Sequence, residues 1–467
     1  MYKFSNIHKA IFETKRLVRL KVHLILAILM VVLLNFLPFF RIGNEILNET
    51  YDYFSQKYLV ATSSQALSKN FHIVTFSEAV YKKYYDQYFT PRELLGESIY
   101  WAVDKGAKVV VVDFGLDSPV PSFCMDQNKA DNENRQLLNW LRKAAETAEK
   151  NGAVILLPEL DLTTSNSTSF ATHQYFSDLS ALLQTFHNNI RQGGVKIAYH
   201  KEDFRTRHFS FFSQKLDAQN KPLPPKALSI PVLAAIYQKY LVSDQVNSSY
   251  EEKERAVIAA NDFIDKQLNL LQSNFQTSKI FTVRDQKGKE IFLISTRNTV
   301  LPARLLFSFS EPPAENSSTP EQLEHLLPGK LDGKVVFIGS TWDKMEDFRH
   351  TSLQMDLPGV VILANAFYML SQNQQLRSQS FFVDLIFKLF IVMSVALLLY
   401  VIFSIFHGKK LAFSIACLVF IVIPWLIPPT VENFTSFYYF HLTGIVVLIY
   451  EFLVELEEFF DKKYISH

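Results

Sequence analysis

Four long apolar segments interrupt an otherwise mixed and mostly polar chain, one near its start and three near its end. They cover residues 22–40, 381–406, 411–428 and 436–454. A helix needs about 20 predominantly apolar residues to cross the hydrocarbon core of a membrane, so each segment is predicted to be a transmembrane helix. The first segment ends in bulky residues rather than in the small ones of a signal-peptide cleavage site, which indicates an anchor that is retained.

Shorter apolar runs alternate with helix-forming stretches in the long region between the spans, residues 41–380. The clearest is the Val-rich run 108–113, which follows a helical stretch over 91–105, and the runs 153–157 and 334–338 are similar. Continuous Val/Ile runs alternating with helices are typical of parallel sheets that are covered on both faces. The sequence therefore predicts an α/β extracytoplasmic domain with a mostly parallel central sheet, in addition to the four transmembrane α-helices.

Weaker patterns add further elements to this predicted domain. Residues 72–76, 194–199 and 290–294 are additional strand candidates, and residues 134–150 and 250–271 are predicted helices. No internal repeat is apparent.

Positive charge predicts how the chain is oriented in the membrane. Residues 1–21 hold six Lys and Arg against one Glu, and the loop 407–410 between the second and third spans is also basic. Because Lys and Arg are enriched in cytoplasmic loops, we expect a cytoplasmic N-terminus, an exported domain, and a cytoplasmic tail at residues 455–467.

Charge and motifs narrow the range of functions. The formal net charge of +1 gives no reason to expect a nucleic-acid partner. Cys124 and Cys417 fall in different predicted compartments and are not expected to pair. The sequence contains no G-x-S-x-G elbow, H-E-x-x-H motif or Walker loop, so we expect neither an enzyme nor a cofactor.

Acidic and hydroxyl side chains follow two of the predicted strands. Asp113 and Asp117 come at the end of the first strand and just beyond it, and Thr341, Asp343 and Asp347 follow the strand at 334–338. In open parallel sheets, ligands bind beyond the carboxyl ends of the strands. These five residues are therefore candidates for ligand binding.

Each of these features also has a purely structural interpretation. Residues 339–341 could hold an anion at a helix start, but Ser or Thr as a helix N-cap is the commoner use of such a turn. Asp343, Asp347 and His350 would share one face of a helix; a solvated face is a simpler explanation than a metal site, and no metal is predicted.

Two further clusters, one basic and one aromatic, also have both a functional and a structural interpretation. Arg207, near Asp203, could clamp a carboxylate or phosphate ligand, or it could belong to a surface network. Tyr81, Tyr84 and Tyr88 could form an interface or a helix face packed on the sheet.

The second half of the region carries an ordered set of motifs. Residues 331–341 read LDGKVVFIGST, followed by Asp347, by Pro-Gly-Val at 358–360 and by Ala-Asn-Ala at 364–366. This order resembles the end of a CHASE2 domain, an extracytoplasmic sensor module of bacterial receptors. Asp203 and Arg207 resemble a further pair of the family, and the arrangement of one span before and three after the domain is also similar.

The resemblance implies a multi-pass protein of the bacterial inner membrane with a periplasmic sensor domain. Because no output domain follows the last span in this sequence, we expect a sensor that acts through a separate protein partner, either a signalling enzyme or an envelope complex. Homo-oligomers are possible. The alternative is a non-enzymatic structural subunit of a membrane-spanning envelope or secretion complex. Asp113, Asp117, Arg207, Thr341, Asp343 and Asp347 are the predicted ligand-binding residues.

Overall fold

The computed structural model divides the chain into two compact units. Residues 62–375 form one unit, and residues 1–61 with 376–467 form the other. The described residues are 52, 56, 71–84, 89–116, 118–120, 126–160, 170–195, 197–199, 205–213, 219, 223–242, 249–274, 280–284, 290–295, 303–304, 307–311, 313–345 and 347–372.

The four predicted transmembrane segments lie outside these described residues. Within the described part of the chain, no helix is both long and apolar enough to cross a membrane.

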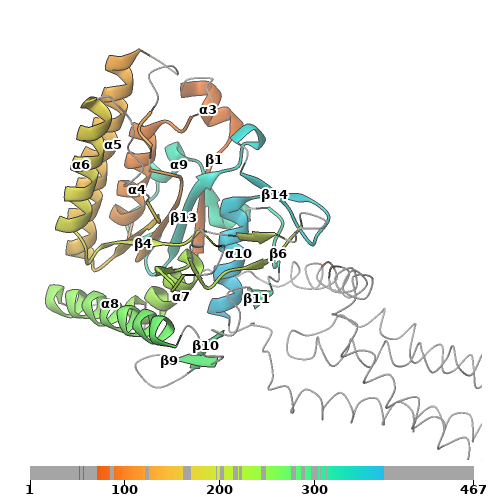
Figure 1. The fold of residues 1–467 in the computed structure, drawn as a ribbon. Helices are drawn as coiled ribbons and strands as arrows, with labels where there is room; N and C mark the ends of the chain where they lie inside the picture. Colours follow the sequence, from red (N-terminus) through yellow and green to blue (C-terminus); the bar gives the residue numbers. More distant parts are fainter. Residues whose placement is uncertain are drawn as a thin grey trace, which may run out of the picture. The chain divides into compact units, whose positions relative to one another are not determined.

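A six-stranded sheet forms the centre of the larger unit (Figure 1). Every neighbouring pair of strands in it is parallel, which confirms the predicted parallel α/β architecture. The strands, in their order across the sheet, are β12 (Ser317–Ser318), β1 (Phe71–Phe76), β13 (Val335–Ser340), β2 (Val109–Asp113), β3 (Val154–Pro158) and β4 (Ile190–Gly193).

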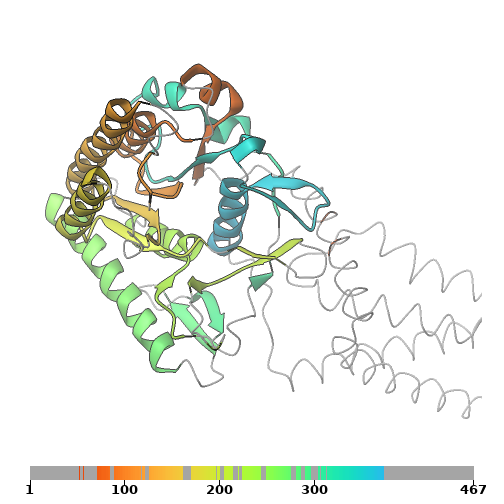
Figure 2. The same ribbon diagram turned by 45° about the horizontal axis from the view of Figure 1, so that its top comes forward.

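Helices cover both faces of this sheet, as the continuous apolar strands require. Figures 1 and 2 show α4, α5 and α6 side by side on one face and α10 on the other. The first face carries α3 (Glu78–Tyr84), α4 (Arg92–Asp104), α5 (Gln127–Asn151), α6 (Phe170–Thr185) and α9 (Pro320–Glu324). The second carries α7 (Ile230–Leu241) and α10 (Gly359–Ser371), with α8 (Tyr250–Ser273) packed on α7.

Side-chain alternation divides the core between the two faces. Val110 and Val112 of β2 belong to the core under α4 and α5. Phe337 of β13 faces the other way and meets Phe367 of α10, with ring centroids 5.4 Å apart. Since successive strand residues point to opposite faces, Asp113 and Gly339 both belong to the α10 face.

Smaller antiparallel elements are attached to the frame. They are a three-stranded sheet of β5 (Ile197–Tyr199), β6 (Thr206–Phe209) and β11 (Ala303–Arg304), and the pairs β7 (Phe212–Ser213) with β8 (Ala227–Leu228), β9 (Ile280–Arg284) with β10 (Glu290–Ser295), and β14 (Phe348–His350) with β15 (Asp356–Pro358). Two short 3-10 helices, η2 (Ala314–Asn316) and η3 (Asp343–Met345), complete the described elements.

One predicted strand is wrong in its extent. Of the strand expected at 194–199, residues 197–199 form β5 in the small antiparallel sheet, whereas the last strand of the main sheet, β4, ends just before this segment at Gly193. Gly194 explains the break, because it forms an isolated bridge with Ser229 instead of continuing the ladder beside β3. The hydrophobic pattern of 194–199 could not distinguish the two sheets.

Candidate functional site

The carboxyl ends of β2 and β13 meet at one edge of the main sheet. Asp113, the last residue of β2, lies opposite Gly339 of β13 in the parallel ladder. On the other side of β13, Gly339 pairs with Thr75 of β1. This edge is where open α/β sheets usually bind ligands.

The first turn of α10 packs directly onto this edge. A Cβ atom placed on Gly339 would lie only 2.5 Å from the Cβ of Val360, the second residue of α10. Only glycine leaves room for the helix to approach the strand so closely. Gly339 and Val360 therefore place the start of α10 within contact distance of the strand that neighbours Asp113.

Asp347 completes the cluster from the segment just before β14. Its backbone carbonyl accepts a 2.8 Å hydrogen bond from the N–H of Gly359, the first residue of α10. Its carboxylate lies against the same glycine, since a Cβ on Gly359 would be 2.5 Å from Oδ2 and 2.8 Å from Oδ1. Asp347 thus contacts the helix start through both its backbone and its side chain.

Neither carboxylate of the pair Asp113 and Asp347 has a conventional partner among the described residues. Oδ2 of Asp113 is fully enclosed and makes no hydrogen bond, although part of the residue remains accessible. Asp347 is half-buried and takes part in none of the ion pairs of the described residues. Enclosing an ionised carboxylate without a partner is costly, so the electrostatics of this pair are unusual.

The surroundings raise the pKa of both acids. Burial raises the pKa of Asp113 well above its usual range, the nearby charge of Asp347 raises it further, and Arg349 opposes both effects. Burial also raises the pKa of Asp347 to about 6, against the lowering influence of Arg349. Two adjacent carboxyl groups that cannot both ionise titrate as a pair.

The opposite face of the same edge is held by neutral hydrogen bonds. Tyr81 of α3 is buried, and its hydroxyl lies 3.3 Å from Oγ1 of Thr90. Burial raises the pKa of Tyr81, so it stays neutral. This buried position confirms the packed-face interpretation for Tyr81, whereas Tyr88 lies outside the described residues.

Arg92 fixes the loop that leaves β2. Its two terminal nitrogens donate to the backbone carbonyls of Gly115 at 3.1 Å and Ser118 at 3.0 Å. The chain after Asp113 is therefore tied to the start of α4, and Asp113 is presented from a fixed loop.

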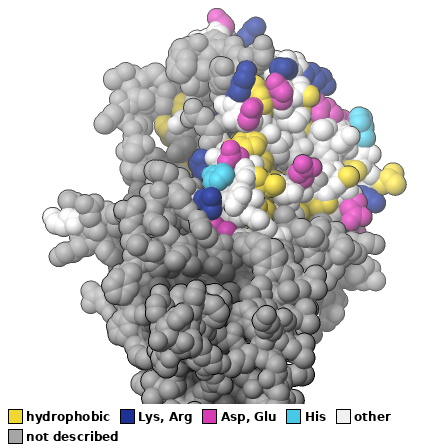
Figure 3. Space-filling view, turned by 90° about the vertical axis from the view of Figure 1, so that its right-hand side faces the viewer, with side chains coloured by type: hydrophobic (Ala, Val, Ile, Leu, Met, Phe, Trp, Pro, Cys, Tyr) yellow, Lys and Arg dark blue, Asp and Glu magenta, His cyan; other side chains and the backbone are white. Residues whose placement is uncertain are grey.

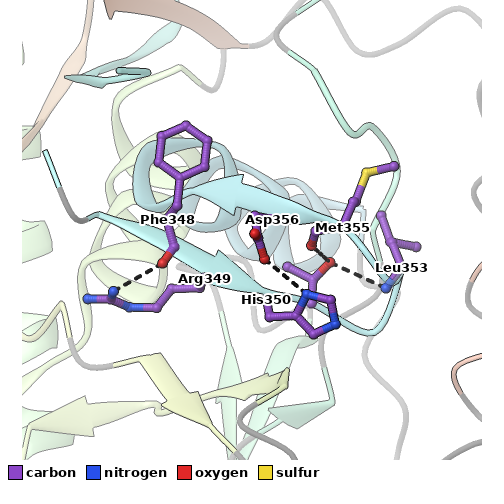
Figure 4. Close-up of polar contacts among 7 residues, drawn as sticks. Phe348, Arg349, His350, Leu353, Met355 and Asp356 are labelled. Atoms are coloured by element: carbon purple, nitrogen blue, oxygen red, sulfur yellow. Dashed lines mark hydrogen bonds and ion pairs between the residues drawn. The ribbon is translucent and has the colours of Figure 1, made fainter. Parts of the chain in front are cut away.

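The hairpin of β14 and β15 extends from Asp347 (Figure 4). His350 Nδ1 and Asp356 Oδ1 lie 2.9 Å apart across the two strands, and Arg349 donates to the carbonyl of Phe348 at 3.1 Å. The predicted helical face of Asp343, Asp347 and His350 is wrong, because a three-residue 3-10 turn is followed by a strand. Instead of sharing a helix face with Asp343 and Asp347, His350 pairs with Asp356 across the hairpin.

The structure brings together some of the six predicted site residues. Asp113 and Asp347 form the pair described above, and Thr341 lies at the same edge, where its N–H donates to the carbonyl of Phe76 at 3.1 Å. Asp343 is exposed on η3 and is not part of the cluster.

The remaining two predicted site residues are Asp117 and Arg207. Asp117 lies outside the described residues. The backbone of Arg207 belongs to β6, whose neighbouring residue Thr206 bridges Thr351 beside the β14–β15 hairpin. This places the backbone of Arg207 near the hairpin, while its side chain lies outside the described part.

A side-chain hydrogen bond closes the turn after β13. Oγ of Ser340 accepts a 3.2 Å hydrogen bond from the N–H of Trp342 at the entry to η3. This contact spans two residues within the turn and is not the helix N-cap predicted for residues 339–341, because η3 begins only at Asp343. Among the described residues, no group of three or more His, Cys, Asp or Glu gathers in a way that could hold a metal ion.

Sequence reasoning missed two members of the cluster as site residues. Gly359 was part of a motif but its contact with Asp347 could not be read from spacing. Arg349 is the basic residue that moderates both acids. The Pro-Gly pair at 358–359, a start of helix with no side chain at its first position, was the available indication of a close approach.

Comparison with known protein families identifies the class of protein. The CHASE2 domain matches residues 25–402, which is most of the chain. The chain therefore belongs to the CHASE2 domain family, a family of extracellular sensory domains. The searches of curated proteins and of solved structures gave no significant match.

Proposed function

We propose that this protein is a sensor-like receptor of the bacterial inner membrane whose periplasmic domain binds a ligand at the carboxyl edge of its sheet. One observation carries the proposal. At that edge the charge of Asp347 raises the pKa of Asp113, and Asp113 has an enclosed oxygen without a hydrogen-bond partner. A ligand that brings a donor or a positive charge would satisfy this pair, because unpaired buried carboxylates gain most from such contacts.

The connection from this edge to the membrane runs through α10. The helix begins at Gly359, beside Asp347, and ends at Ser371, shortly before the span predicted at 381–406. A ligand can shift the domain only by binding two of its states differently. In this proposal the bound ligand changes the contact between Asp347 and the helix start, and α10 carries the change to a partner protein.

Tight anchoring along α10 supports a concerted response. Asn365, in the middle of the helix, is fully buried, and its side chain makes four hydrogen bonds, three of them to residues 308 and 309. Packed elements held at several points tend to move between discrete arrangements rather than to bend gradually.

The described surface favours a local site over a broad protein-binding face. In the view of Figure 3, hydrophobic, acidic and basic side chains are interspersed over the described residues. Of the large apolar side chains that are exposed among the described residues, Tyr250, Ile258 and Leu270 are spaced along α8, and Leu223, Leu327 and Met355 lie singly elsewhere. Scattered apolar residues are normal on any protein and do not mark an interface.

Hydrogen exchange on the full-length protein in lipid nanodiscs tests the proposal. The small-molecule fraction of an envelope extract is added, and exchange is followed in peptides from residues 335–372. We expect protection in the unmodified protein and its loss in a D113N/D347N variant, while D343N, an exposed acid on the same segment, behaves like the unmodified protein.

The structural-subunit alternative gives a different result in the same preparation. In that case no fraction would protect residues 335–372, and crosslinking in intact membranes would recover envelope proteins in a fixed ratio to this protein. That combination would replace the sensor proposal.

A further inference from the structure

The position of Asp113 and Asp347 at the carboxyl edge of the sheet suits the binding of the smallest ligand, a proton. Asp113 reaches the edge from β2, opposite Gly339, and Asp347 reaches it from the segment just before β14, where it contacts the first turn of α10. Since Oδ2 of Asp113 is enclosed without a partner, placing two negative charges there would leave one of them uncompensated. One proton on the pair removes this cost.

The groups that face the pair supply little positive charge. Arg349 is the basic side chain that influences both acids. From the opposite face of the edge, α3 contributes the neutral Tyr81, and Arg92 of α4 is engaged with two backbone carbonyls. The first four residues of α10, the first four of α7, which packs on β2, and the residue of β13 opposite Asp113 carry no ionisable group. Asp356 of β15 is bound to His350.

We infer that Asp113 and Asp347 form a proton-binding site: the pair holds one proton at neutral pH and takes up a second on acidification, which tightens the contact between Asp347 and the start of α10. This inference rests on the proposed function, because it names the proton as a ligand of the same site. A protonated Asp347 has no charge to lose from water when the hairpin and the helix start enclose it, so the two stay in close contact.

The direction of the effect follows from linkage. Burial raises the pKa of Asp347 from 3.8 to about 6, so the closed arrangement binds more protons than an open one in which this carboxyl is solvated. Closure is therefore favoured at low pH and weakens as the pH rises through about 6. The shift of about two units corresponds to a change of up to about a hundredfold in the opening equilibrium.

Infrared difference spectroscopy on the full-length protein in nanodiscs, in buffer without added ligand, tests this inference. The carbonyl stretch of protonated carboxyl groups is recorded from about pH 8 to about pH 4. At neutral pH, we expect the spectrum of the unmodified protein minus that of D113N to show one protonated carboxyl. A second should appear with a midpoint near 6 and be absent in D347N, with both retained in D343N.

The variants also report on the consequence for α10. In the same samples, exchange of residues 347–362, corrected for the intrinsic effect of pH, should slow on acidification in the unmodified protein and in D343N. In D347N it should stay slow at all pH values. Circular dichroism identifies any variant that fails to fold, and D113N and D347N each provide an independent test.

Two results would overturn the inference. The first is an infrared difference spectrum that is the same in the unmodified protein, D113N and D347N. The second is a titration near pH 6 without any change in exchange at residues 347–362. Because this experiment contains no envelope extract, its failure is distinct from failure of the ligand-binding test above.

Discussion

The two ends of the central sheet treat buried ionisable groups in opposite ways. At the amino end, His72 of β1 is buried, and its Nε2 lies 2.9 Å from Oγ of Ser318 on the neighbouring strand. Burial, with the charges of Lys334 and Lys330, lowers its pKa to about 4. His72 is therefore neutral over the physiological range and contributes packing and a hydrogen bond.

At the carboxyl end, burial instead raises the pKa of two acids toward physiological pH. Burial raises the pKa of Asp347 to about 6 and raises that of Asp113 well above its ordinary value. Burial removes a charged group from water and so disfavours its charged form. At one end of the sheet this lowers the pKa of a base, which stays neutral; at the other end it raises the pKa of two acids. The comparison indicates that the carboxyl end is the responsive end of the domain.

The largest expected effect comes from removing the hydrogen bonds that hold α10, the helix whose first turn packs on the carboxyl end of the sheet. In N365L, the backbone N–H groups of Ser308 and Phe309 and the carbonyl of Phe309 lose their partner. Unpartnered buried groups cost roughly 1–3 kcal/mol each, so we expect a loss of about 4 kcal/mol in the free energy of unfolding. Denaturation of the full-length protein in nanodiscs, followed by tryptophan fluorescence, measures it; a loss below about 1 kcal/mol would mean that α10 is held elsewhere.

Acid should weaken the amino end through His72. The unfolded chain binds a proton on this histidine near its ordinary pKa of 6.5, while the folded domain does so only near 4. Its contribution to stability is therefore complete above pH 6.5 and is lost as the pH falls from 6.5 to 4, by about 3 kcal/mol in total. H72Q should lose this acid dependence, whereas H187Q, at an exposed histidine, should retain it.

Neutralising the carboxyl end should stabilise the domain at neutral pH. The raised pKa of Asp347 means that its ionised form is disfavoured in the folded state, so this residue contributes stability below its unfolded pKa of 3.8 that is lost as the pH rises through about 6. An asparagine at position 347 does not ionise, so D347N does not lose this stability as the pH rises. Allowing for partial solvent exposure, we expect D347N to gain about 2 kcal/mol near neutral pH, measured by the same denaturation. A destabilised D347N would contradict the picture of an uncompensated charge.

A smaller effect is expected where Asp347 contacts α10. The new Cβ in G359A would lie 2.5 Å from Oδ2 of Asp347 and push this flexible carboxylate away. The better helix propensity of alanine offsets part of the cost, leaving a net loss of about 1 kcal/mol. The infrared midpoint of Asp347 should also shift, since its contacts change. G339A, which meets the branched Cβ of Val360 instead, should cost more without removing the acid pair.

The sequence predicts the frame of this domain well and its site only in part. Continuous Val runs such as Val109–Asp113 and Val335–Ser340 are determined by burial on both faces, which the composition of a strand reveals directly. The edge at which Asp113 and Thr341 lie follows from the parallel arrangement of those strands. These features depend on local pattern and on a general rule of topology.

The remaining features depend on contacts between distant segments. The helical alignment of Asp343 with His350 is wrong because the chain there pairs with β15 as a hairpin, a choice made by tertiary contacts rather than by spacing. The extent of β4 depends on a bridge from Gly194 to Ser229. The contact of Asp347 with Gly359, which defines the acid pair, requires the helix and strand to be placed in space.

Hydrogen exchange at the two ends of the sheet, measured across pH on the full-length protein in nanodiscs, tests the central claim most directly. Peptides covering β1, with His72, report on the amino end, and peptides covering residues 347–362 report on the carboxyl end. Between about pH 8 and about pH 5, after correction for intrinsic rates, we expect slower exchange on acidification at the carboxyl end and no slowing at the amino end. Equal behaviour of the two ends would contradict the assignment of the carboxyl end as the responsive one.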